Sequence, residues 1–312
     1  MKNKLIGNKI QHTTISSDKF SREHMSYQGN KKEHRIQLPE GYLERLDQKR
    51  YSKNTVKTNV NYFKDFMKYF KGYEIHEITP DQINCYILDL IRNKNISHSQ
   101  QNQRINSINF YYEKVLQQEK QKYDIDRPRR AHTLPEVLSK EEIKAIIDSC
   151  SNLKHKAMLG LLYSSGLRHS ELLNLKISDV DSKRMLLRIV GSKGKKDRYS
   201  LLSNYSLNLL RKYYLQYKPK KWLFEGINGN QYSPTSLQNI LKHAARKANI
   251  QKRVHLHMLR HSFATHLLEQ GTNIRLIQEI LGHESIKTTE IYIHISNHEL
   301  KNIKNPADKL FT

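Results

Sequence analysis

The sequence predicts a mainly α-helical protein of two domains, with a small antiparallel β-sheet in the second. Apolar residues recur at intervals of three and four over much of residues 38–118 and again after residue 139, which is the spacing of one helix face. The pattern changes to short β-type runs around residues 185–202. Between the two helical regions, a polar and charged stretch contains Pro128 and Pro135, which argue against a continuous helix there. We therefore expect an all-helical first domain and an α+β second domain.

The chain is strongly basic. Its 312 residues contain 54 Lys and Arg against 30 Asp and Glu, a formal net charge of +24. This excess indicates a polyanionic partner, either nucleic acid or an anionic membrane surface. No run approaches the ~18 to 20 apolar residues of a spanning helix, and no apolar signal segment follows the first lysines. Cys85 and Cys150 lack the spacing of a disulfide framework or a metal site. We expect a cytoplasmic protein that binds nucleic acid and not a membrane.

Composition divides the chain into five segments. Residues 1–36 are polar and basic without sustained periodicity, which predicts a flexible tail. The first domain is expected over residues 37–120, and the composition of residues 121–137 indicates a linker. The second domain is expected over residues 138–298. It leaves residues 299–312 as a short, partly apolar C-terminal segment.

Helix-start signals define the elements of the first domain. Ser52 precedes a run of apolar residues that share one helix face: Val56, Val60, Phe63, Met67 and Phe70. Two further helices begin with capping boxes, in which an N-cap hydroxyl and a glutamine three residues later satisfy the first amides: Thr79 with Gln82, and Ser97 with Gln100. With a helix near residues 40–49, these make a bundle of four or five helices.

The second domain begins with another capping box, Ser139 with Glu142. A β-hairpin is expected from residues 185–190 and 199–202, which flank a basic tip, and residues 222–224 are a candidate third strand. The expected helices cover about residues 139–148, 153–163, 168–175, 233–248, 257–270, 273–281 and 286–295.

His257, Arg260 and His261 lie at positions i, i+3 and i+4, so their side chains share one helix face. Three interpretations are open for this segment: phosphate chemistry, a hydrogen-bonded structural role and a zinc site. The metalloprotease form of the zinc motif needs Glu after the first His, but Met258 stands there. An arginine between the two histidines also disfavours a dication.

The other polar candidates are weak when taken singly. Arg168 in the first turn of a helix, beside Glu171, is typical of a solvated helix terminus. Lys193 at a hairpin tip is typical of a solvated lysine. Gly282 follows an apolar run and is expected as a left-handed helix C-cap, with His283 just beyond it. A lone tyrosine such as Tyr292 is usually a buried structural ring.

The joint order and spacing of these segments carry more information than any one of them. The four segments are Gly166-Leu-Arg168-His-Ser-Glu-Leu-Leu, Gly191-Ser-Lys193-Gly-Lys-Lys-Asp-Arg198, His257-x-x-Arg260-His261-Ser-Phe-Ala-Thr-His-Leu-Leu, and Leu281-Gly-His283-x4-Thr-Thr-x-x-Tyr292. Together they resemble the tyrosine recombinase (phage-type integrase) family, particularly its Xer-like and integron-integrase-like members. The resemblance covers about residues 38–300.

The resemblance implies a fold and a catalytic set. It implies an N-terminal SAM-like core-binding domain that clamps DNA, and a C-terminal catalytic domain. All six positions of the family's catalytic set are filled: Arg168, Lys193, His257, Arg260, His283 and Tyr292. We choose Lys193 over the neighbouring Lys195 and Lys196 because it occupies the Lys-Gly position of the family pattern.

The resemblance also implies roles for these residues. Tyr292 would attack a DNA phosphate to form a 3′-phosphotyrosyl intermediate, and the arginines would stabilise its charge without a metal or other cofactor. Lys193 would be the general acid, His257 the general base and His283 a phosphate donor, with Glu171 as structural support.

The implied partners are double-stranded DNA with specific recombination sites, a homotetramer on paired sites and accessory directionality proteins. The expected function is site-specific recombination at the nucleoid. We also expect residues 299–312 to dock on a neighbouring protomer. Two alternatives remain: a type IB topoisomerase-like relaxing enzyme, and a non-catalytic DNA-binding protein on the same fold.

Overall fold

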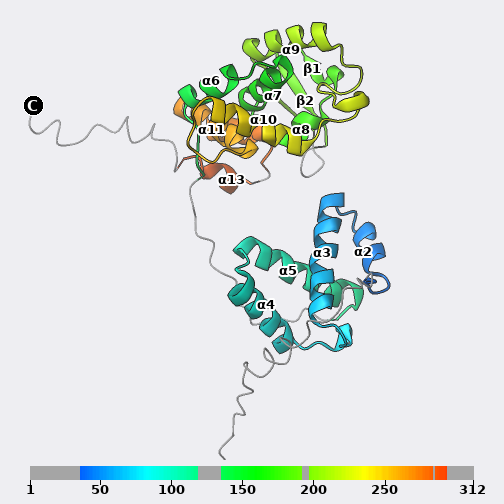
Figure 1. Ribbon diagram of the computed structural model, residues 1–312. Coiled ribbons are helices and arrows are strands. Elements are labelled where there is room, and N and C mark those ends of the chain that lie inside the picture. The colour runs from blue at the N-terminus through cyan, green and yellow to red at the C-terminus, as the bar shows by residue number, and fades with distance from the viewer. Residues whose placement is uncertain (1–35, 119–134, 192–196, 284, 294–312) are drawn as a thin grey trace, which may run out of the picture. The chain divides into compact units, whose positions relative to one another are not determined.

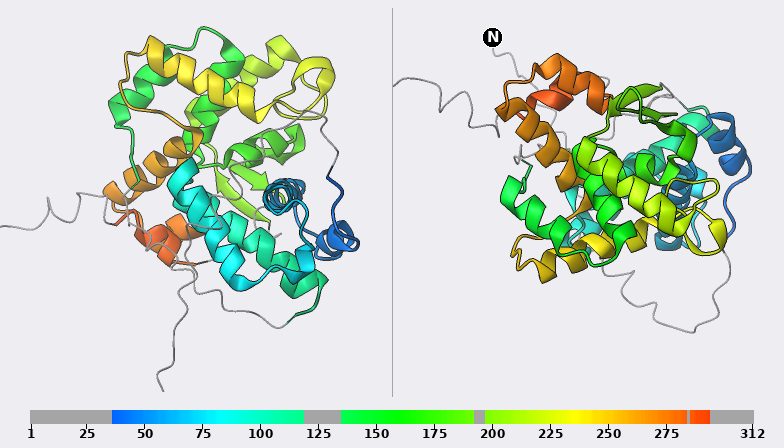
Figure 2. Two further views of the ribbon diagram at one scale, coloured as in Figure 1. Left: turned by 60° about the horizontal axis from the view of Figure 1, so that its bottom comes forward. Right: turned by 90° about the horizontal axis from the view of Figure 1, so that it is seen from above.

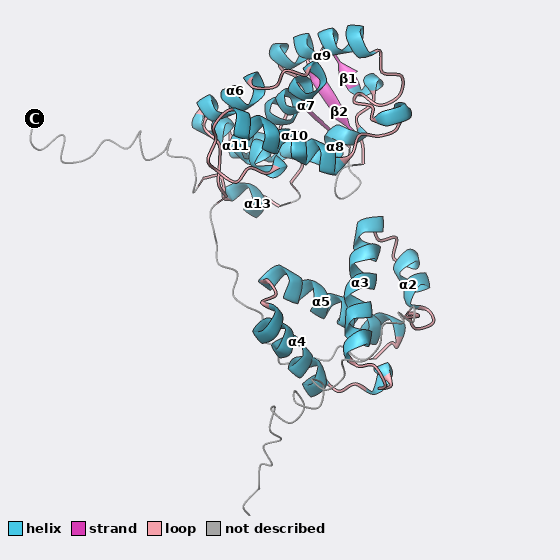
Figure 3. Ribbon diagram, in the orientation of Figure 1, coloured by secondary structure: helices cyan, strands magenta, loops and turns pink. Residues whose placement is uncertain are grey.

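The computed structural model describes residues 36–118, 135–191, 197–283 and 285–293 (Figure 1). The chain forms two compact units, residues 1–131 and residues 132–312. Both units are mainly helical, as predicted (Figure 3). The tail over residues 1–35, most of the expected linker, the hairpin tip with Lys193, Lys195 and Lys196, and the segment over residues 299–312 lie outside the described residues.

The N-terminal unit is helical throughout its regular elements, and its capping signals act as predicted. Thr79 Oγ1 accepts from Gln82 N, while Gln82 Oε1 accepts from Thr79 N, and Ser97 and Gln100 form the same pair. The helices are α2 (Tyr42–Gln48), α3 (Lys53–Tyr69), α4 (Pro80–Lys94) and α5 (His98–Phe110), with a 3-10 turn at Ile75–Glu77 and a π-helical turn at Tyr111–Val115.

Aromatic side chains fill the core of this unit. The rings of Tyr42 and Phe63 stack with centroids 4.6 Å apart, and Phe66 meets Tyr86 edge-on at 5.4 Å. All four side chains are at most 1% exposed. The helical periodicity of α3 therefore reflects a face packed against this core.

The helices of the C-terminal unit are α6 (Lys140–Asp148), α7 (Leu153–Ser164), α8 (His169–Asn174), α9 (Asn204–Tyr217), α10 (Pro234–Lys247), α11 (Leu256–Glu269), α12 (Ile274–Leu281) and α13 (Lys287–Glu290). The unit is built around α7, whose residues from Ala157 to Leu162 are all buried. The helix packs against α6, α8, α9, α10 and α11 (Figure 1). Because it is surrounded in this way, its segment from Ala157 to Leu162 is apolar all round and does not alternate between an apolar and a polar face.

A three-stranded antiparallel sheet of order β1-β2-β3 completes the unit. Its strands are β1 (Val180–Asp181), β2 (Leu186–Ile189) and β3 (Arg198–Leu201), with Ile189 opposite Arg198. The predicted hairpin is thus confirmed. The third strand expected at residues 222–224 is wrong, because Trp222 forms an isolated bridge with Lys176 and β1 takes the sheet position.

Two further elements differ from the sequence expectation. Helix α9 is absent from that expectation, although Ser203 caps it and Leu207, Leu210 and Tyr213 are buried on one face. Helix α13 covers only Lys287–Glu290, whereas a longer helix is expected from the sequence over residues 286–295. Residues 291–293 form turns instead.

The last two helices lie where they can position polar groups. Helix α12 packs against α11, β3 and α13, and the short helices α12 and α13 appear in orange and red in Figure 2. Gly282 ends α12 in the left-handed conformation, with φ 63°, as predicted.

Candidate active site

Arg168 stands at the start of α8, after a turn that only glycine allows. Gly166 has φ +57°, and a Cβ on it would lie 2.4 Å from Cδ1 of Phe263. The first turn of α8 then brings Glu171 back to Arg168. The Glu171 carboxylate accepts from the backbone N of Arg168 through Oε2 and from Nη1 through Oε1, each at 2.7 Å. Glu171 therefore serves both the helix start and the guanidinium.

Arg198, the first residue of β3, reaches the same carboxylate from the sheet. Its Nη1 and Nη2 donate to the two oxygens of Glu171 at 2.7 and 2.8 Å, which is a bidentate fork. Burial opposes ionisation of Glu171, but the hydrogen bonds and charges of Arg198 and Arg168 outweigh it and lower its pKa from 4.5 to about 2. The carboxylate is therefore ionised at neutral pH.

Arg260 comes from α11 and is 1% exposed. Its Nη1 donates to the carbonyl of Gly166 at 2.7 Å and its Nη2 to the carbonyl of Leu281 at 2.6 Å. Burial, followed by the charge of Arg168, lowers its pKa from 12.5 to about 9. The guanidinium remains the charged form at neutral pH.

Three consecutive carbonyls at the carboxyl end of α12 each accept from one of these arginines. Arg198 Nε donates to Ile280 O at 2.9 Å, Arg260 Nη2 to Leu281 O at 2.6 Å, and Arg168 Nη2 to Gly282 O at 3.3 Å. The carbonyl end of a helix carries partial negative charge, which favours cations there. Three guanidinium groups thus surround one carboxylate, and the cluster carries an excess of two positive charges.

His283 follows the left-handed Gly282 and turns back toward α13. Its Nδ1 lies 2.9 Å from the buried hydroxyl of Thr289, and its ring stacks on Tyr292 with centroids 6.4 Å apart. Burial and the charge of Arg260 lower its pKa from 6.5 to about 3. His283 is therefore neutral near pH 7 and can act as a hydrogen-bond partner.

Tyr292 is 1% exposed, and its hydroxyl lies 3.0 Å from Nδ1 of His261. Burial raises the pKa of Tyr292 to about 12, against the opposing charges of Arg260 and Arg168. Burial also lowers the pKa of His261 to about 4. The phenol is thus protonated and the imidazole neutral, and the hydroxyl donates to Nδ1 in the tautomer that carries its proton on Nε2.

His257 lies one turn before His261, with ring centroids 5.1 Å apart. Burial, then the charge of Arg260, lowers its pKa. The hydroxyl contact that the resemblance leads us to expect for His257 is made by His261 in this structure. The i, i+4 spacing of the two histidines is the sequence signal that could have found it.

The structure thus brings together five of the six residues predicted for the site: Arg168, His257, Arg260, His283 and Tyr292. Lys193 lies outside the described residues. Sequence reasoning places Arg198 and His261 in motifs but gives neither a role in the site.

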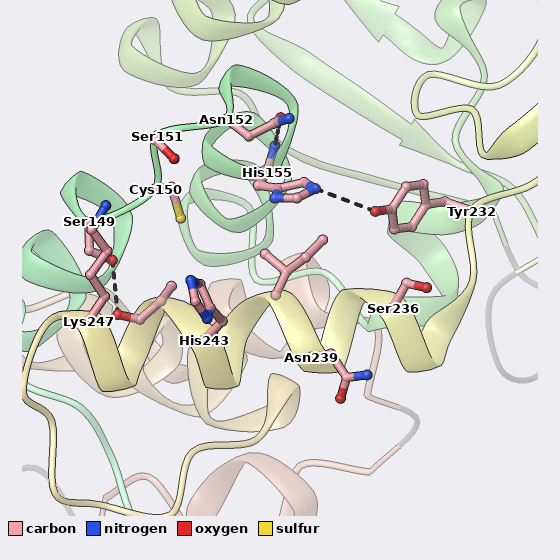
Figure 4. Close-up of a pocket in the computed structure, with 12 residues that line it drawn as sticks. Ser149, Cys150, Ser151, Asn152, His155, Tyr232, Ser236, Asn239, His243 and Lys247 are labelled. Atoms are coloured by element: carbon pink, nitrogen blue, oxygen red, sulfur yellow. Dashed lines mark hydrogen bonds between the residues drawn. The ribbon is translucent and has the colours of Figure 1, made fainter.

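A separate cavity of about 330 Å³ lies between the start of α7 and one face of α10 (Figure 4). It is lined by His155, Tyr232, His243 and Lys247 among others, and the Tyr232 hydroxyl lies 3.5 Å from Nε2 of His155. None of the predicted site residues that the structure describes lines this cavity. The candidate active site is therefore not this cavity but the arginine cluster, formed by Arg168, Arg198 and Arg260 around Glu171.

Over the described ranges, no group of three or more His, Cys, Asp or Glu side chains is arranged to hold a metal ion. The same part of the chain contains no helix long and apolar enough to cross a membrane.

Comparison with known families decides the relationship of this chain. The family model described as "Phage integrase family" matches residues 136–299, more than half of the chain, and that described as "Phage integrase, N-terminal SAM-like domain" matches residues 38–122. The chain belongs to the phage integrase family. Within this family it is an Xer-like, site-specific tyrosine recombinase, an enzyme that exchanges DNA strands. The predicted SAM-like class of the N-terminal domain of this recombinase is confirmed.

Individual relatives of this recombinase agree over most of its length. A tyrosine recombinase of Thermosipho africanus (strain TCF52B) is 33% identical over 276 residues, covering 85% of this chain and 96% of the relative. Tyrosine recombinase XerD of Rickettsia bellii (strain RML369-C) is 34% identical over 284 residues, covering 82% and 93%. The crystal structure of XerH site-specific recombinase bound to palindromic difH substrate, in a post-cleavage complex, has the same fold, with a TM-score of 0.66 at 22% identity over 83% of this chain and 82% of that one.

Proposed function

We propose that the arginine cluster, with Lys193, is the site at which this recombinase cuts and rejoins double-stranded DNA, and that Tyr292 is its nucleophile. The observation that carries the proposal is the charge of the cluster. Three guanidinium groups compensate a single carboxylate beside a tyrosine hydroxyl, so an incoming phosphate meets a site with an excess of positive charge.

In the proposed step, Oη of Tyr292 forms a bond to the phosphorus as the bond from phosphorus to the 5′-oxygen breaks. The products are a 3′-phosphotyrosyl ester and a free 5′-hydroxyl. The ester replaces one phosphodiester by another, so the same step run backwards rejoins the strand without ATP.

Arg168 and Arg260 would stabilise the pentavalent phosphorus by donating to its non-bridging oxygens. In the resting structure Arg168 has a 3.3 Å contact to Gly282 O, the longest of the three arginine contacts to α12. This contact is the one most easily exchanged for a phosphate oxygen. His283, neutral beside the arginines, would donate a further hydrogen bond to the phosphate.

Proton transfer completes the step. The phenol of Tyr292 must lose its proton as it attacks, and the neutral ring of His257 would accept it as general base. In this structure Tyr292 is 1% exposed and its hydroxyl is hydrogen-bonded to His261. To attack a phosphate, the hydroxyl would have to leave His261 when DNA enters. Lys193 would protonate the leaving 5′-oxygen.

We propose that residues 37–120 form the core-binding domain and residues 138–298 the catalytic domain, joined by a linker over residues 121–137 so that both can hold one duplex. Four protomers would act on two specific sites through a Holliday junction, with residues 299–312 docked on a neighbouring protomer and directionality proteins as accessories. DNA as substrate places this work in the cytoplasm, at the nucleoid. The solved XerH complex with its difH substrate supports DNA as the partner.

The experiment is covalent trapping on a nicked suicide duplex bearing the recombination site, followed by denaturing gel electrophoresis. The wild-type protein is expected to form a DNA adduct without added metal or ATP, and the variant Tyr292→Phe to form none. A wild-type protein that binds this duplex without an adduct would support the alternative of a non-catalytic DNA-binding protein.

The same preparation separates recombinase from topoisomerase. Plasmid without a recombination site should stay supercoiled, since cutting by a recombinase depends on the site. Efficient relaxation of that plasmid would instead favour a type IB topoisomerase-like enzyme.

A further inference from the structure

Arg198 is buried in the active site but has no role in the chemistry proposed above. Its side chain is 9% exposed, and all three guanidinium nitrogens are engaged with the protein. Two donate to Glu171 and the third to the carbonyl of Ile280. These contacts leave it badly placed to bind phosphate itself, so a role for Arg198 must act through its partners.

The contacts of Arg198 join three elements that are distant in the sequence. Arg198 begins β3, Glu171 lies in α8, and Ile280 lies in the last turn of α12. The fit is close, because a Cβ on Gly282 would lie 2.7 Å from Cδ of Arg198. Arg198 therefore fixes the carboxylate of Glu171 against the end of α12.

The fork also determines how Glu171 is shared. Arg198 occupies both carboxylate oxygens, while Arg168 uses a single side-chain bond to Oε1, and Arg260 Nη1 stays 3.7 Å from Oε2. Without Arg198, the carboxylate would be compensated by Arg168 and Arg260 alone. The net charge of the cluster would fall from two positive charges to one, and both guanidinium groups would be drawn toward Glu171 and away from a phosphate.

We propose that Arg198 is a positioning residue of this recombinase, which neutralises Glu171 so that Arg168 and Arg260 remain available for the scissile phosphate. This inference rests on the proposed function and extends it to a residue outside the predicted catalytic set.

The test measures the rate of covalent adduct formation at saturating suicide DNA, together with the affinity for an intact site. Arg198→Met should slow adduct formation by about 10- to 100-fold, the effect of losing a hydrogen-bonded charge, while the DNA affinity changes by less than about threefold. Arg198→Lys keeps the charge but cannot form the bidentate fork with Glu171. Its rate of adduct formation should therefore fall between those of the wild type and of Arg198→Met.

The double variant Arg198→Met/Glu171→Gln tests whether the uncompensated charge of Glu171 causes the slower adduct formation of Arg198→Met. It restores an excess of two positive charges, so it should form the adduct faster than Arg198→Met alone. Arg188→Met is the matched control: Arg188 lies on the paired strand β2, is 53% exposed and lies 3.5 Å from Asp179, and its loss should leave the rate unchanged.

The outcomes separate this inference from the proposed function. A wild-type rate for Arg198→Met, or a folded double variant no faster than Arg198→Met, would overturn the role of Arg198 while trapping by the wild type still supports the function. Absence of an adduct with the wild-type protein would overturn both. If Arg198→Met fails to fold, the rates of Arg198→Lys and of the double variant decide the question, and a wild-type rate for Arg198→Lys overturns the need for the fork.

Discussion

At the scale of single residues, the charged groups of the site and its neutral hydrogen-bonding groups are different side chains. Its positive charge belongs to Arg168, Arg198 and Arg260, whereas the pKa values of His261 and His283, about 4 and about 3, make both imidazoles neutral near pH 7. The same burial that neutralises the histidines raises the pKa of Tyr292 to about 12. Tyr292, the proposed nucleophile, is therefore held protonated in this structure.

A substitution at Gly282 tests how closely the side chain of Arg198 packs against the end of α12. Its φ of +63° is left-handed, and a Cβ would also meet the side chain of Arg198 at 2.7 Å. Gly282→Ala should therefore lose about 1–2 kcal/mol for the backbone strain and about 1–3 kcal/mol more for the overlap. Urea unfolding of the purified protein measures the loss.

Gly271 offers a matched control, since its φ is +83° and a Cβ there meets nothing within 4 Å. Gly271→Ala should show the backbone strain alone. Equal losses of unfolding free energy for the two variants would mean that Arg198 does not pack against Gly282 as described.

The residues that sequence reasoning identified are those with a recognisable local pattern. Arg168 follows its glycine turn, and Gly282 follows an apolar run. The contact of Arg198 with Glu171 spans 27 residues and that with Ile280 spans 82, so neither leaves a periodic signal. His261 was visible on the correct face, but only the structure shows that it, and not His257, holds the Tyr292 hydroxyl.

At the scale of elements, α12 links the core to the site. Ile277 and Leu281 are fully buried, while the carbonyls of its last turn accept from the arginines. Packing of one face of this short helix thus determines where the acceptors lie.

Leu281→Ala should cost about 2–5 kcal/mol of unfolding free energy, because it leaves a cavity among the buried side chains of α11 and α12, and it should slow adduct formation. Leu276, on the same helix, is 53% exposed, so Leu276→Ala should change the stability by at most about 0.5 kcal/mol. Thermal unfolding and suicide-substrate trapping measure both effects. Equal behaviour of the two variants would contradict the role of the α12 core face.

Most elements with local start signals were predictable, whereas the pairing of β1 was not. The capping boxes at Thr79, Ser97 and Ser139 all form as expected, since each involves residues three apart. Strand β1 is two residues long, too short to show alternation, so its pairing with β2 could not be predicted. Helix α9 is a different case, because its cap and its buried face are both local signals that the sequence does contain.

At the scale of the whole molecule, two separately packed units and a net charge of +24 suit a protein that holds a polyanion with both parts. Each unit matches its own integrase family model. The fold class followed from periodicity and caps, whereas the function was implied by the resemblance of four short motifs, in their order, to a known family. Composition alone left two alternatives for the polyanionic partner, nucleic acid and an anionic membrane surface.

The most direct test of the central claim is the chemical identity of the trapped adduct. The wild-type protein would be trapped on a suicide duplex and digested with protease, and the DNA-linked peptide would be sequenced by mass spectrometry. The predicted result is a peptide in which Tyr292 is esterified to the 3′-phosphate of the cut strand. A linkage to another residue, or to a 5′-phosphate, would contradict the account.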